Sequence, residues 1–229
     1  MKKFGLFFLI LLLSPLFYTQ AQSVDLIIQG ESYTPPFYLG RTLWSKQSKA
    51  NFLAIPNNAG NPSSLIYKWK RDGTVLGSLS GVGKNTLSLN DVLFSKPQVI
   101  EVEILDNSEE SIASSTLMIT PTSQTIIVYE NNPLYGFMFN KEAMGTYKLT
   151  DREITFTAFP FFFSALNRFD SLVNYEWKTD AGGSGRENSV TYRVPEDSVV
   201  SSGVSIKASH GKKFIQTANT GFLVQFGEQ

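Results

Sequence analysis

The segment "LIYKWKRDG" at residues 65–73 decides the fold, because a near copy, "VNYEWKTDA", occurs at residues 173–181. In each copy a tyrosine precedes a tryptophan by two residues, and a lysine and a turn sequence follow. Side chains alternate between the two faces of a β-strand, so the tyrosine and the tryptophan share one face and charged residues occupy the other. This pattern predicts an antiparallel strand with one face on a core and one in water. The predicted core residues are Tyr67, Trp69, Tyr175 and Trp177.

Other short matches occur in the same order around the two tryptophans. "AIP" at 54–56 corresponds to "AFP" at 158–160, and "NTLSL" at 85–89 to "NSVTY" at 188–192, with offsets of 104 and 103 residues. "PFY" at 36–38 matches "PLY" at 133–135 with an offset of 97. Because the order is kept and the offset changes only between segments, the sequence predicts a tandem duplication.

Each repeat is predicted to be β throughout. Segments such as "NFLAIP", "TLSLND" and "VIEVEIL" are rich in β-branched and aromatic residues and are separated by turn clusters. About seven strands in about 100 residues fit an immunoglobulin-type sandwich. We therefore expect an all-β chain with two tandem immunoglobulin-like antiparallel β-sandwiches, domain 1 over residues 22–121 and domain 2 over residues 122–229, joined near "TPTSQT" at 120–125.

The segment "YKWKRDGTVL" resembles strand C and the following turn of immunoglobulin-like domains, in which a buried tryptophan anchors the core. PKD-like surface modules resemble it in the same way. The cysteine pair of antibody domains is missing, since the chain has no cysteine. The segments "YTPPFY", "YKWKRDG", "GKNTL" and "NPLYG" also make the chain similar to uncharacterised exported bacterial proteins built from two such modules. That resemblance implies a fold and an exported location but no activity.

Residues 1–21 read as a signal peptide. Lys2 and Lys3 precede an apolar run from Phe4 to Phe17, and the small residues Thr19 and Ala21 suit cleavage before Gln22. The alternative is an uncleaved N-terminal anchor, which would be the chain's only expected membrane contact. The run of about 14 apolar residues is shorter than the ~20 that a spanning helix needs, and this favours cleavage. We expect an exported protein of the periplasm, cell surface or extracellular space.

The charge balance argues against nucleic acid as a partner. The chain has 20 basic and 20 acidic residues, and loss of the signal segment removes two of the basic ones. Phosphate recognition needs clustered Lys and Arg, and no such cluster is present. One histidine and no cysteine leave zinc or copper without an ordinary ligand set. No cofactor and no metal are expected.

Three motifs carry weak chemical signals. "SGVGKNT" at 80–86 departs from a phosphate-binding loop, because Ser78 stands where the first glycine belongs and a strand follows in place of a helix. His210 is interpreted as a solvent-exposed turn residue. Acidic residues near 106–110, Asp170 and Asp197 could bind calcium, but Asp also favours turn geometry.

Aromatic segments give the strongest functional signal. "YTPPFYLGRTLW" at 33–44 and "FPFFF" at 159–163 do not alternate, and prolines keep the first of them out of a strand ladder. These rings either close a sandwich end and fill the seam between the repeats, or remain exposed as a binding patch. Trp44 has no evident counterpart in the second repeat, which favours a role outside the shared core. The predicted binding-surface residues are Tyr33, Phe37, Tyr38, Trp44, Tyr135 and Phe137.

The leading hypothesis is a non-enzymatic exported surface or envelope protein that acts as a protein-interaction or structural module, as an accessory of a pilus, adhesion or secretion assembly. A second hypothesis is a carbohydrate-binding module that stacks sugars on Tyr33, Phe37, Tyr38 or Trp44. The partner is accordingly an envelope protein or a surface glycan. A glycosidase with paired carboxylates is the third hypothesis, although no spacing nominates a pair.

Overall fold

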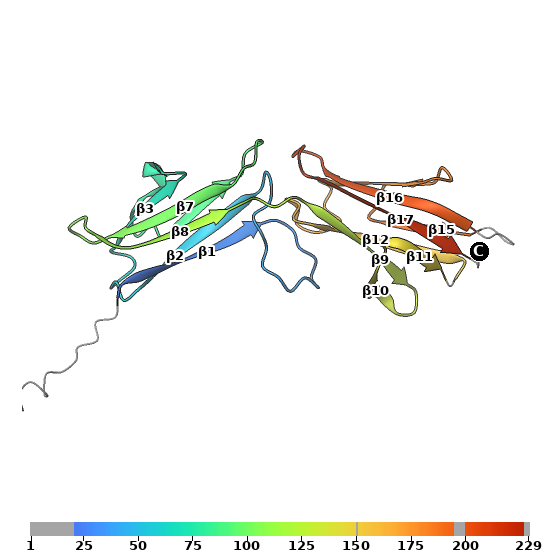
Figure 1. Ribbon diagram of the computed structural model, residues 1–229, viewed down its shortest axis with the longest axis horizontal. Helices are drawn as coiled ribbons and strands as arrows, with labels where there is room; N and C mark the ends of the chain where they lie inside the picture. The colour runs from blue at the N-terminus through green and yellow to red at the C-terminus, as the bar shows by residue number, and fades with distance from the viewer. Residues whose placement is uncertain (1–20, 150, 195–199, 227–229) are drawn as a thin grey trace, which may run out of the picture.

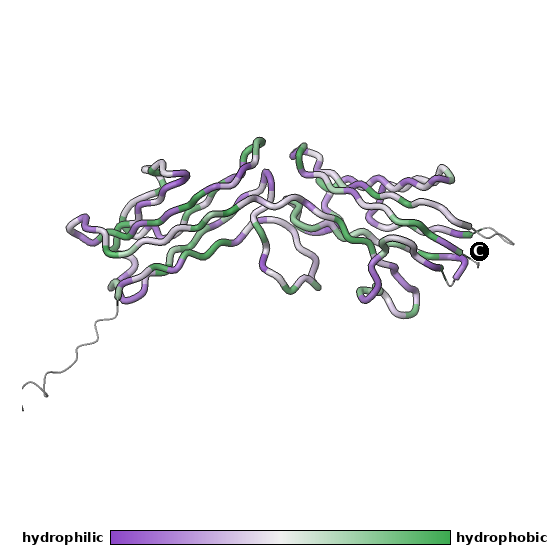
Figure 2. Tube along the Cα trace, in the orientation of Figure 1, coloured by the Kyte–Doolittle hydropathy of each residue, from purple (hydrophilic) through white to green (hydrophobic). Residues whose placement is uncertain are grey.

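The computed structural model describes residues 21–149, 151–194 and 200–226, which form two β-sandwiches joined end to end (Figure 1). The predicted signal peptide, apart from Ala21, lies outside the described residues. Within the described part of the chain, no helix is both long and apolar enough to cross a membrane. Figure 2 shows hydrophobic residues distributed along the strands of both sandwiches, as expected for two separate cores.

The first sandwich consists of a sheet in the order β1-β2-β6 and a sheet in the order β4-β3-β7-β8, with β5 also paired to β3. Its elements are β1 (Ser23–Glu31), β2 (Lys49–Asn57), β3 (Ile66–Arg71), β4 (Thr74–Val75), the short 3-10 helix η1 (Gly77–Leu79), β5 (Gly81–Val82), β6 (Thr86–Asn90), β7 (Gln98–Leu105) and β8 (Ser111–Ile119).

The second sandwich repeats this plan with β10 and β11 added and, among the described residues, without a counterpart of β5. Its sheets have the orders β10-β9-β12-β15 and β11-β17-β16-β13-β14. The elements are β9 (Thr125–Asn132), β10 (Gly136–Glu142), β11 (Gly145–Leu149), β12 (Glu153–Phe161), β13 (Val173–Thr179), β14 (Ser184–Gly185), β15 (Ser189–Arg193), β16 (Val200–His210) and β17 (Thr217–Phe226). These strand orders confirm the predicted all-β, immunoglobulin-like class for both repeats.

The two cores repeat the same local contacts. Trp69 on β3 donates its indole N–H to the Lys84 carbonyl at 2.8 Å, and Trp177 on β13 donates to the Glu187 carbonyl at the same distance. Both indoles are fully buried, and the tyrosines two residues before them are also buried. The two acceptors immediately precede the asparagines that begin "NTLSL" and "NSVTY". The duplication inferred from the sequence is therefore visible in hydrogen bonds as well as in strand order.

The outward lysines of the opening segment do not form a free basic patch. Lys70 lies 2.6 Å from Glu101 and 3.3 Å from Glu103 on the neighbouring strand β7. Lys68 also pairs with Glu103, at 3.4 Å. Cross-strand pairs of opposite charge of this kind support sheet pairing modestly. Lys68 and Lys70 thus belong to the solvated face of a core strand.

Candidate functional site

The segment between β1 and β2, residues 32–48, leaves the first sandwich and contacts the second. Tyr33 forms an isolated antiparallel bridge with Phe163: its N–H donates to the Phe163 carbonyl, and its carbonyl accepts from the Phe162 N–H, both at 2.7 Å. Figure 1 shows this loop below the junction, beside the second sandwich. The sandwiches are thus joined by backbone hydrogen bonds outside the connecting chain.

Aromatic rings from both sandwiches form what we call the aromatic seam. Phe37 packs against Phe139 with ring centroids 4.4 Å apart and against Phe159 at 5.1 Å. Tyr38 meets Phe161 and Phe162 edge-on at 5.6 and 5.9 Å. Edge-to-face pairs at these distances are favourable beyond the area that they bury. The members are Phe37 and Tyr38 from the first sandwich and Tyr129, Phe137, Phe139, Phe159, Phe161 and Phe162 from the second.

The aromatic seam explains why "FPFFF" does not alternate. Strand β12 directs Phe156 and Ala158 into the second core, and it directs Phe159 and Phe161 to the opposite face. That outer face would meet water in an isolated sandwich. Here Phe37 and Tyr38 of the 32–48 segment cover it together with Phe137 and Phe139 of β10, so large apolar residues are favourable at consecutive positions. Of the two interpretations of this segment, the structure supports packing at the seam between the repeats.

A tight turn at Ser45–Ser48 supplies polar contacts across the junction. The Lys46 carbonyl accepts hydrogen bonds from the side-chain amides of Gln216 at 2.7 Å and Gln124 at 3.2 Å. The Gln47 carbonyl accepts one from Lys213 Nζ at 2.6 Å, and Gln47 Oε1 accepts one from the Ile215 N–H at 3.2 Å. Buried polar groups cost little free energy only when they are paired in this way.

The turn is fixed from the first core. The Trp44 indole donates to the Ser48 carbonyl at 3.1 Å, and Ser48 Oγ donates to the Ser45 carbonyl at 2.7 Å. Asp91 Oδ2 accepts from the Gln47 N–H at 3.0 Å. Gln47 nevertheless has a positive φ of 55°. Phe162, which bonds Tyr33, has a φ of 63°, an unfavourable value for a bulky residue. Two strained residues at one junction indicate that the surrounding contacts determine its geometry.

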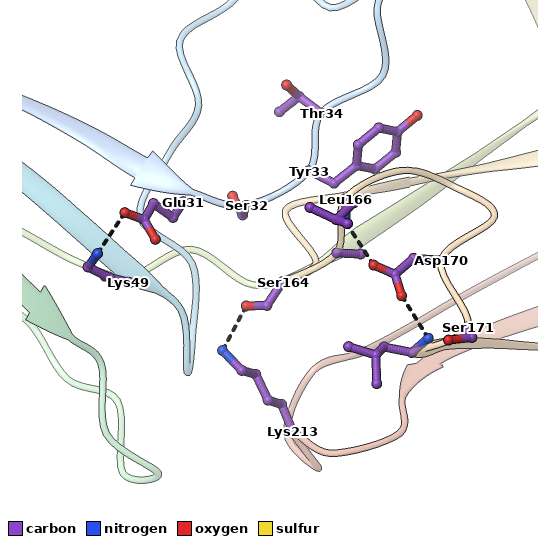
Figure 3. Close-up of a pocket in the computed structure, with 12 residues that line it drawn as sticks. Glu31, Ser32, Tyr33, Thr34, Lys49, Ser164, Leu166, Asp170, Ser171 and Lys213 are labelled. Atoms are coloured by element: carbon purple, nitrogen blue, oxygen red, sulfur yellow. Dashed lines mark hydrogen bonds and ion pairs between the residues drawn. The ribbon is translucent and has the colours of Figure 1, made fainter.

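An open groove of about 930 Å³ runs along the junction and is lined by residues of both sandwiches. In Figure 3, Glu31 and Lys49 form an ion pair on one side, and Lys213 points to Ser164 on the other. The corresponding distances are 2.9 Å for Lys49 to Glu31 and 3.0 Å for Lys213 Nζ to Ser164 Oγ. The groove is therefore lined by charged and polar side chains from both sandwiches.

Hydrogen bonds hold the two carboxylates of the groove in their ionised state, whereas burial disfavours the charged form of Lys213. Hydrogen bonds from Asn51 and Lys49 lower the pKa of Glu31. Hydrogen bonds from the Leu166 and Leu172 N–H groups lower the pKa of Asp170. Burial lowers the pKa of Lys213, whose amine donates to two neutral oxygens, the Gln47 carbonyl and Ser164 Oγ. This set can bind polar groups and complementary charge, but neither carboxyl is suited to donate a proton near neutral pH.

Exposed apolar side chains from both sandwiches lie around the junction, and we call them the apolar rim. The β6–β7 loop carries Phe94, 85% exposed, and the β16–β17 loop carries Phe214, 76% exposed. Leu166, which lines the groove, is 89% exposed. The loops that carry Phe94 and Phe214 approach the same turn, since Asp91 and Ile215 both bond Gln47. Figure 2 shows their hydrophobic tips facing each other above the junction.

The prediction that Trp44 belongs to a binding surface is wrong. Its side chain is 1% exposed and lies in the first core, so its indole is not available for sugar stacking. Trp44 does have a counterpart, Tyr147. Trp44 meets Phe52 edge-on at 5.9 Å, and Tyr147 meets the equivalent Phe156 edge-on at 5.3 Å. Different residue types and shifted spacing conceal this correspondence in the sequence.

The other predicted surface residues do not form one patch. Phe37, Tyr38 and Phe137 are half-buried in the aromatic seam. Tyr33 lines the groove and is also half-buried, and burial raises the pKa of its phenol. Tyr135 is exposed at the β9–β10 turn, two residues before Phe137. Whether any of them binds a ligand remains a prediction.

His210 is buried, which corrects its interpretation as a solvent-exposed turn residue. Its Nδ1 accepts from the Lys212 and Lys213 N–H groups at 3.0 and 3.1 Å, and its Nε2 lies 3.0 Å from the Ser164 carbonyl. This pattern fits a neutral ring with its hydrogen on Nε2. The histidine thus holds the β16–β17 loop against Ser164, and this loop carries Lys213, which bonds Gln47 of the first sandwich.

Turn-forming roles also account for two of the candidate calcium carboxylates. Asp106 Oδ1 accepts from the Ser108 and Glu110 N–H groups, and Asp170 organises the Leu166–Leu172 loop. Asp197 lies outside the described residues. No group of three or more His, Asp or Glu side chains suited to a metal occurs in the part of the chain that the structure describes. Residues 80–86 form β5 and the turn that leads to β6.

No family model and no curated protein matches the chain. Among solved structures, fibronectin(III)-like modules of CbhA from Clostridium thermocellum match with a TM-score of 0.30 and 10% identity, over 87% of this chain and 94% of that chain. The chicken interferon gamma receptor alpha chain matches with a TM-score of 0.35 and 8% identity, over 81% and 96%. Sidekick-1 immunoglobulin domains 1–4 match with a TM-score of 0.31 and 13% identity, over 92% of this chain and 51% of that chain. The likeness concerns the fold alone.

Proposed function

We propose that the chain is an exported, non-enzymatic interaction module that binds a protein partner at the junction of its two sandwiches. The observation that carries this proposal is the apolar rim, to which both sandwiches contribute exposed side chains. Exposed apolar groups next to polar, hydrogen-bonding walls are typical of protein-binding surfaces. Tandem immunoglobulin-like sandwiches are common in cell-surface interaction and structural modules, and this agrees with the predicted signal peptide. An accessory role in a pilus, adhesion or secretion assembly belongs to this proposal.

The seam contacts support a binding role that requires a fixed geometry. A surface shared by two domains is useful only when the domains keep their relative orientation. Here the Tyr33–Phe163 bridge, the Lys46 and Gln47 contacts and the aromatic seam all join the sandwiches. A preorganised surface loses less conformational entropy when a partner binds.

The two alternatives gain less support. Sugar stacking on Trp44 is incompatible with its burial. A glycosidase needs one carboxyl group kept protonated as a general acid. Glu31 and Asp170, the carboxylates that line the groove, have their pKa values lowered, by hydrogen bonds from Asn51 and Lys49 and from backbone N–H groups respectively.

The proposal can be tested with Phe94→Asp and Phe214→Asp in the mature chain, residues 22–229. Each variant and the wild-type protein would be used to capture partners from envelope extract and would be applied to a glycan array. Leu134→Asp is the matched control, because Leu134 is similarly exposed but lies at the β9–β10 turn. We expect a stoichiometric protein partner that both rim variants lose and the control retains.

Two results would overturn the proposal. One is partner binding that persists in both rim variants, which would place the interaction elsewhere. The other is saturable glycan binding abolished by the rim variants, which would favour the carbohydrate alternative. Export is tested separately, by sequencing the N-terminus of the protein recovered outside the cytoplasm. Cleavage of the signal peptide predicts Gln22 as the first residue.

A further inference from the structure

The last strands of the two sandwiches, β8 and β17, occupy equivalent positions but have different neighbours. In the second sandwich β17 lies between β16 and β11. In the first sandwich β8 is paired with β7, and no other strand among the described residues pairs with its second edge. Among the described residues, a strand pairs with this edge in the second repeat, whereas in the first repeat pairing begins only at Thr122, beyond the end of β8.

Strand β11 shows what covers the edge in the second sandwich. It runs parallel to β17, from Gly145 opposite Phe222 to Leu149 opposite Phe226. Its Tyr147 and Leu149, two residues apart, are buried in the second core, whereas Thr146 and Lys148 are exposed. A covering strand at this place therefore needs two large apolar side chains on alternate residues and a polar residue between them.

The inward face of β8 lacks such cover. Its register with β7 directs Ala113, Ser115, Leu117 and Ile119 to the interior, opposite Ile104, Val102, Ile100 and Gln98. All four partners on β7 are buried, but each of the four β8 residues is only partly buried. On β17, the positions equivalent to Leu117 and Ile119 are Phe222 and Val224, and both are buried.

Apolar side chains of β1 are exposed beside the same edge. Leu26 and Ile28 on β1, like Ile112, Leu117 and Ile119 on β8, border the first core while remaining partly exposed. Figure 1 shows β1 and β8 running next to each other along this flank. An added strand would therefore remove apolar surface from water in addition to forming main-chain hydrogen bonds.

The β8 edge also lacks the features that usually prevent strand addition. Its nine residues, "SIASSTLMI", include no charged residue and no proline, and the outward Met118 is 71% exposed. Proteins commonly protect an exposed edge with lysine, proline or a covering loop. Cover begins only beyond the strand, where Ser45 forms a parallel bridge with Thr122.

We propose that the open edge of β8 is a strand-addition site that receives an extended segment of another protein. The segment runs parallel to β8 and places two large apolar side chains, two residues apart, against the partly exposed inward side chains of β8, on the Ser111 side of the place in the first core that Trp44 already fills. Strand β11 is the internal template for both the direction and the side-chain pattern. This surface is separate from the apolar rim, so it goes beyond the proposed function and does not depend on it. Peptide recognition by an added strand combines main-chain hydrogen bonds with pockets for alternate side chains.

A synthetic peptide with the sequence of residues 141–153, "KEAMGTYKLTDRE", serves as the probe because it contains β11. We expect saturable binding to the mature chain, and at least about tenfold weaker binding of a peptide with Tyr147→Asp and Leu149→Asp. In the mature chain, Ser115→Lys places a charge on the inward face of the edge, and Thr116→Lys places the same charge on the outward face. Ser115→Lys should weaken binding by about tenfold or more, whereas Thr116→Lys should leave it nearly unchanged.

Crosslinking locates the peptide and gives its direction without relying on the fold of Ser115→Lys. The chain has no cysteine, so Ser111→Cys and Thr120→Cys provide single thiols at the two ends of β8. A peptide with an N-terminal cysteine should form a disulfide with Ser111→Cys and not with Thr120→Cys. The opposite preference would overturn the parallel arrangement. Absence of binding, or a homodimer of the mature chain that Ser115→Lys dissociates, would overturn the proposal of a partner strand.

Discussion

The connection from β1 to β2 in the first sandwich corresponds to the connection from β9 to β12 in the second, but the two connections make different contacts. Residues 32–48 and residues 133–149 occupy the same place in the duplicated fold, and each sends one aromatic, Trp44 or Tyr147, onto the equivalent phenylalanine of its core. The first segment then contacts the other sandwich, whereas the second forms β10 and β11 on its own sheets. The two repeats thus have cores built on the same pattern, and they differ in what one connection contacts.

This difference has an energetic consequence for each repeat. The second sandwich gains an additional strand on each sheet, and its outer face is covered by Phe37 and Tyr38. The first sandwich contributes those residues and leaves the β8 edge open. We therefore expect the second sandwich to depend on the first for part of its stability, and the first to have the greater capacity to accept another chain.

The largest effects on stability are expected from substitution of the two core tryptophans. Trp69→Ala and Trp177→Ala each remove a fully buried indole and leave the Lys84 or Glu187 carbonyl without its partner. Each should reduce the free energy of unfolding of its own sandwich by roughly 3–5 kcal/mol. Calorimetry that resolves two transitions should show the mutated sandwich melting earlier. An unchanged melting temperature in either variant would refute the assignment of that strand to the core.

The second largest difference is expected at alkaline pH, which should lower the stability of the second sandwich more than that of the first. Burial raises the pKa of the phenols of Tyr147, Tyr175 and Tyr192 in the second sandwich, that of Tyr192 from 10.0 to about 12. A hydrogen bond to Glu130 adds to the effect at Tyr147. A group with a raised folded-state pKa contributes stability that is complete below its unfolded value of about 10 and is lost as the pH rises toward the folded value.

Several phenols act together in the second sandwich. We therefore expect the stability that it loses at alkaline pH to exceed the loss caused by any single seam substitution. In the first core, burial raises the pKa of Tyr67 alone among the tyrosines. Thermal unfolding measured from pH 8 to 11 should show the second transition falling first. Tyr192→Phe should flatten that fall, since Tyr192 Oη has no hydrogen-bond partner to lose. Parallel decline of both transitions would contradict this view.

The fold was largely predictable from the sequence because its strongest signals are local. Tyr67, Trp69 and their repeats alternate with charged residues, and this alternation requires only a strand with one buried face. The seam was not predictable in detail, because Gln47, Ser164 and Gln216 lie in or next to loops and resemble solvated polar residues in the sequence. Only their pairing partners, distant along the chain, make their burial favourable. The aromatic run at 159–163 did indicate the seam, as one of two alternatives.

A smaller effect is expected at the aromatic seam. Phe37→Ala removes a half-buried ring that meets Tyr129, Phe139, Phe159 and Phe161 with centroids between 4.4 and 6.0 Å. We expect the stability of the second sandwich to fall by about 2 kcal/mol, at the scale of a few aromatic pairs. Small-angle scattering should also show a broader distribution of interdomain distances. Leu39→Ala, in the same loop but fully exposed, is the control and should resemble the wild type. Identical curves for the two variants would argue against coupling through these rings.

The smallest effect on stability should come from the polar contacts between the sandwiches, which contribute less than the two cores do. Gln216 is fully buried, and its amide joins the Lys46 carbonyl of the first sandwich to Ser164 of the second. Gln216→Leu keeps the volume but leaves the Ser164 N–H without its acceptor and removes one of the two amide hydrogen bonds to the Lys46 carbonyl, at a cost of about 1–2 kcal/mol. Asn219→Ala, at an exposed position of β17 three residues further along the chain, should change stability by less than about 0.5 kcal/mol. If the polar seam fixes orientation, Gln216→Leu should also weaken partner capture at the apolar rim, although no rim residue is altered. Normal capture by a destabilised Gln216→Leu protein would restrict the role of this residue to folding.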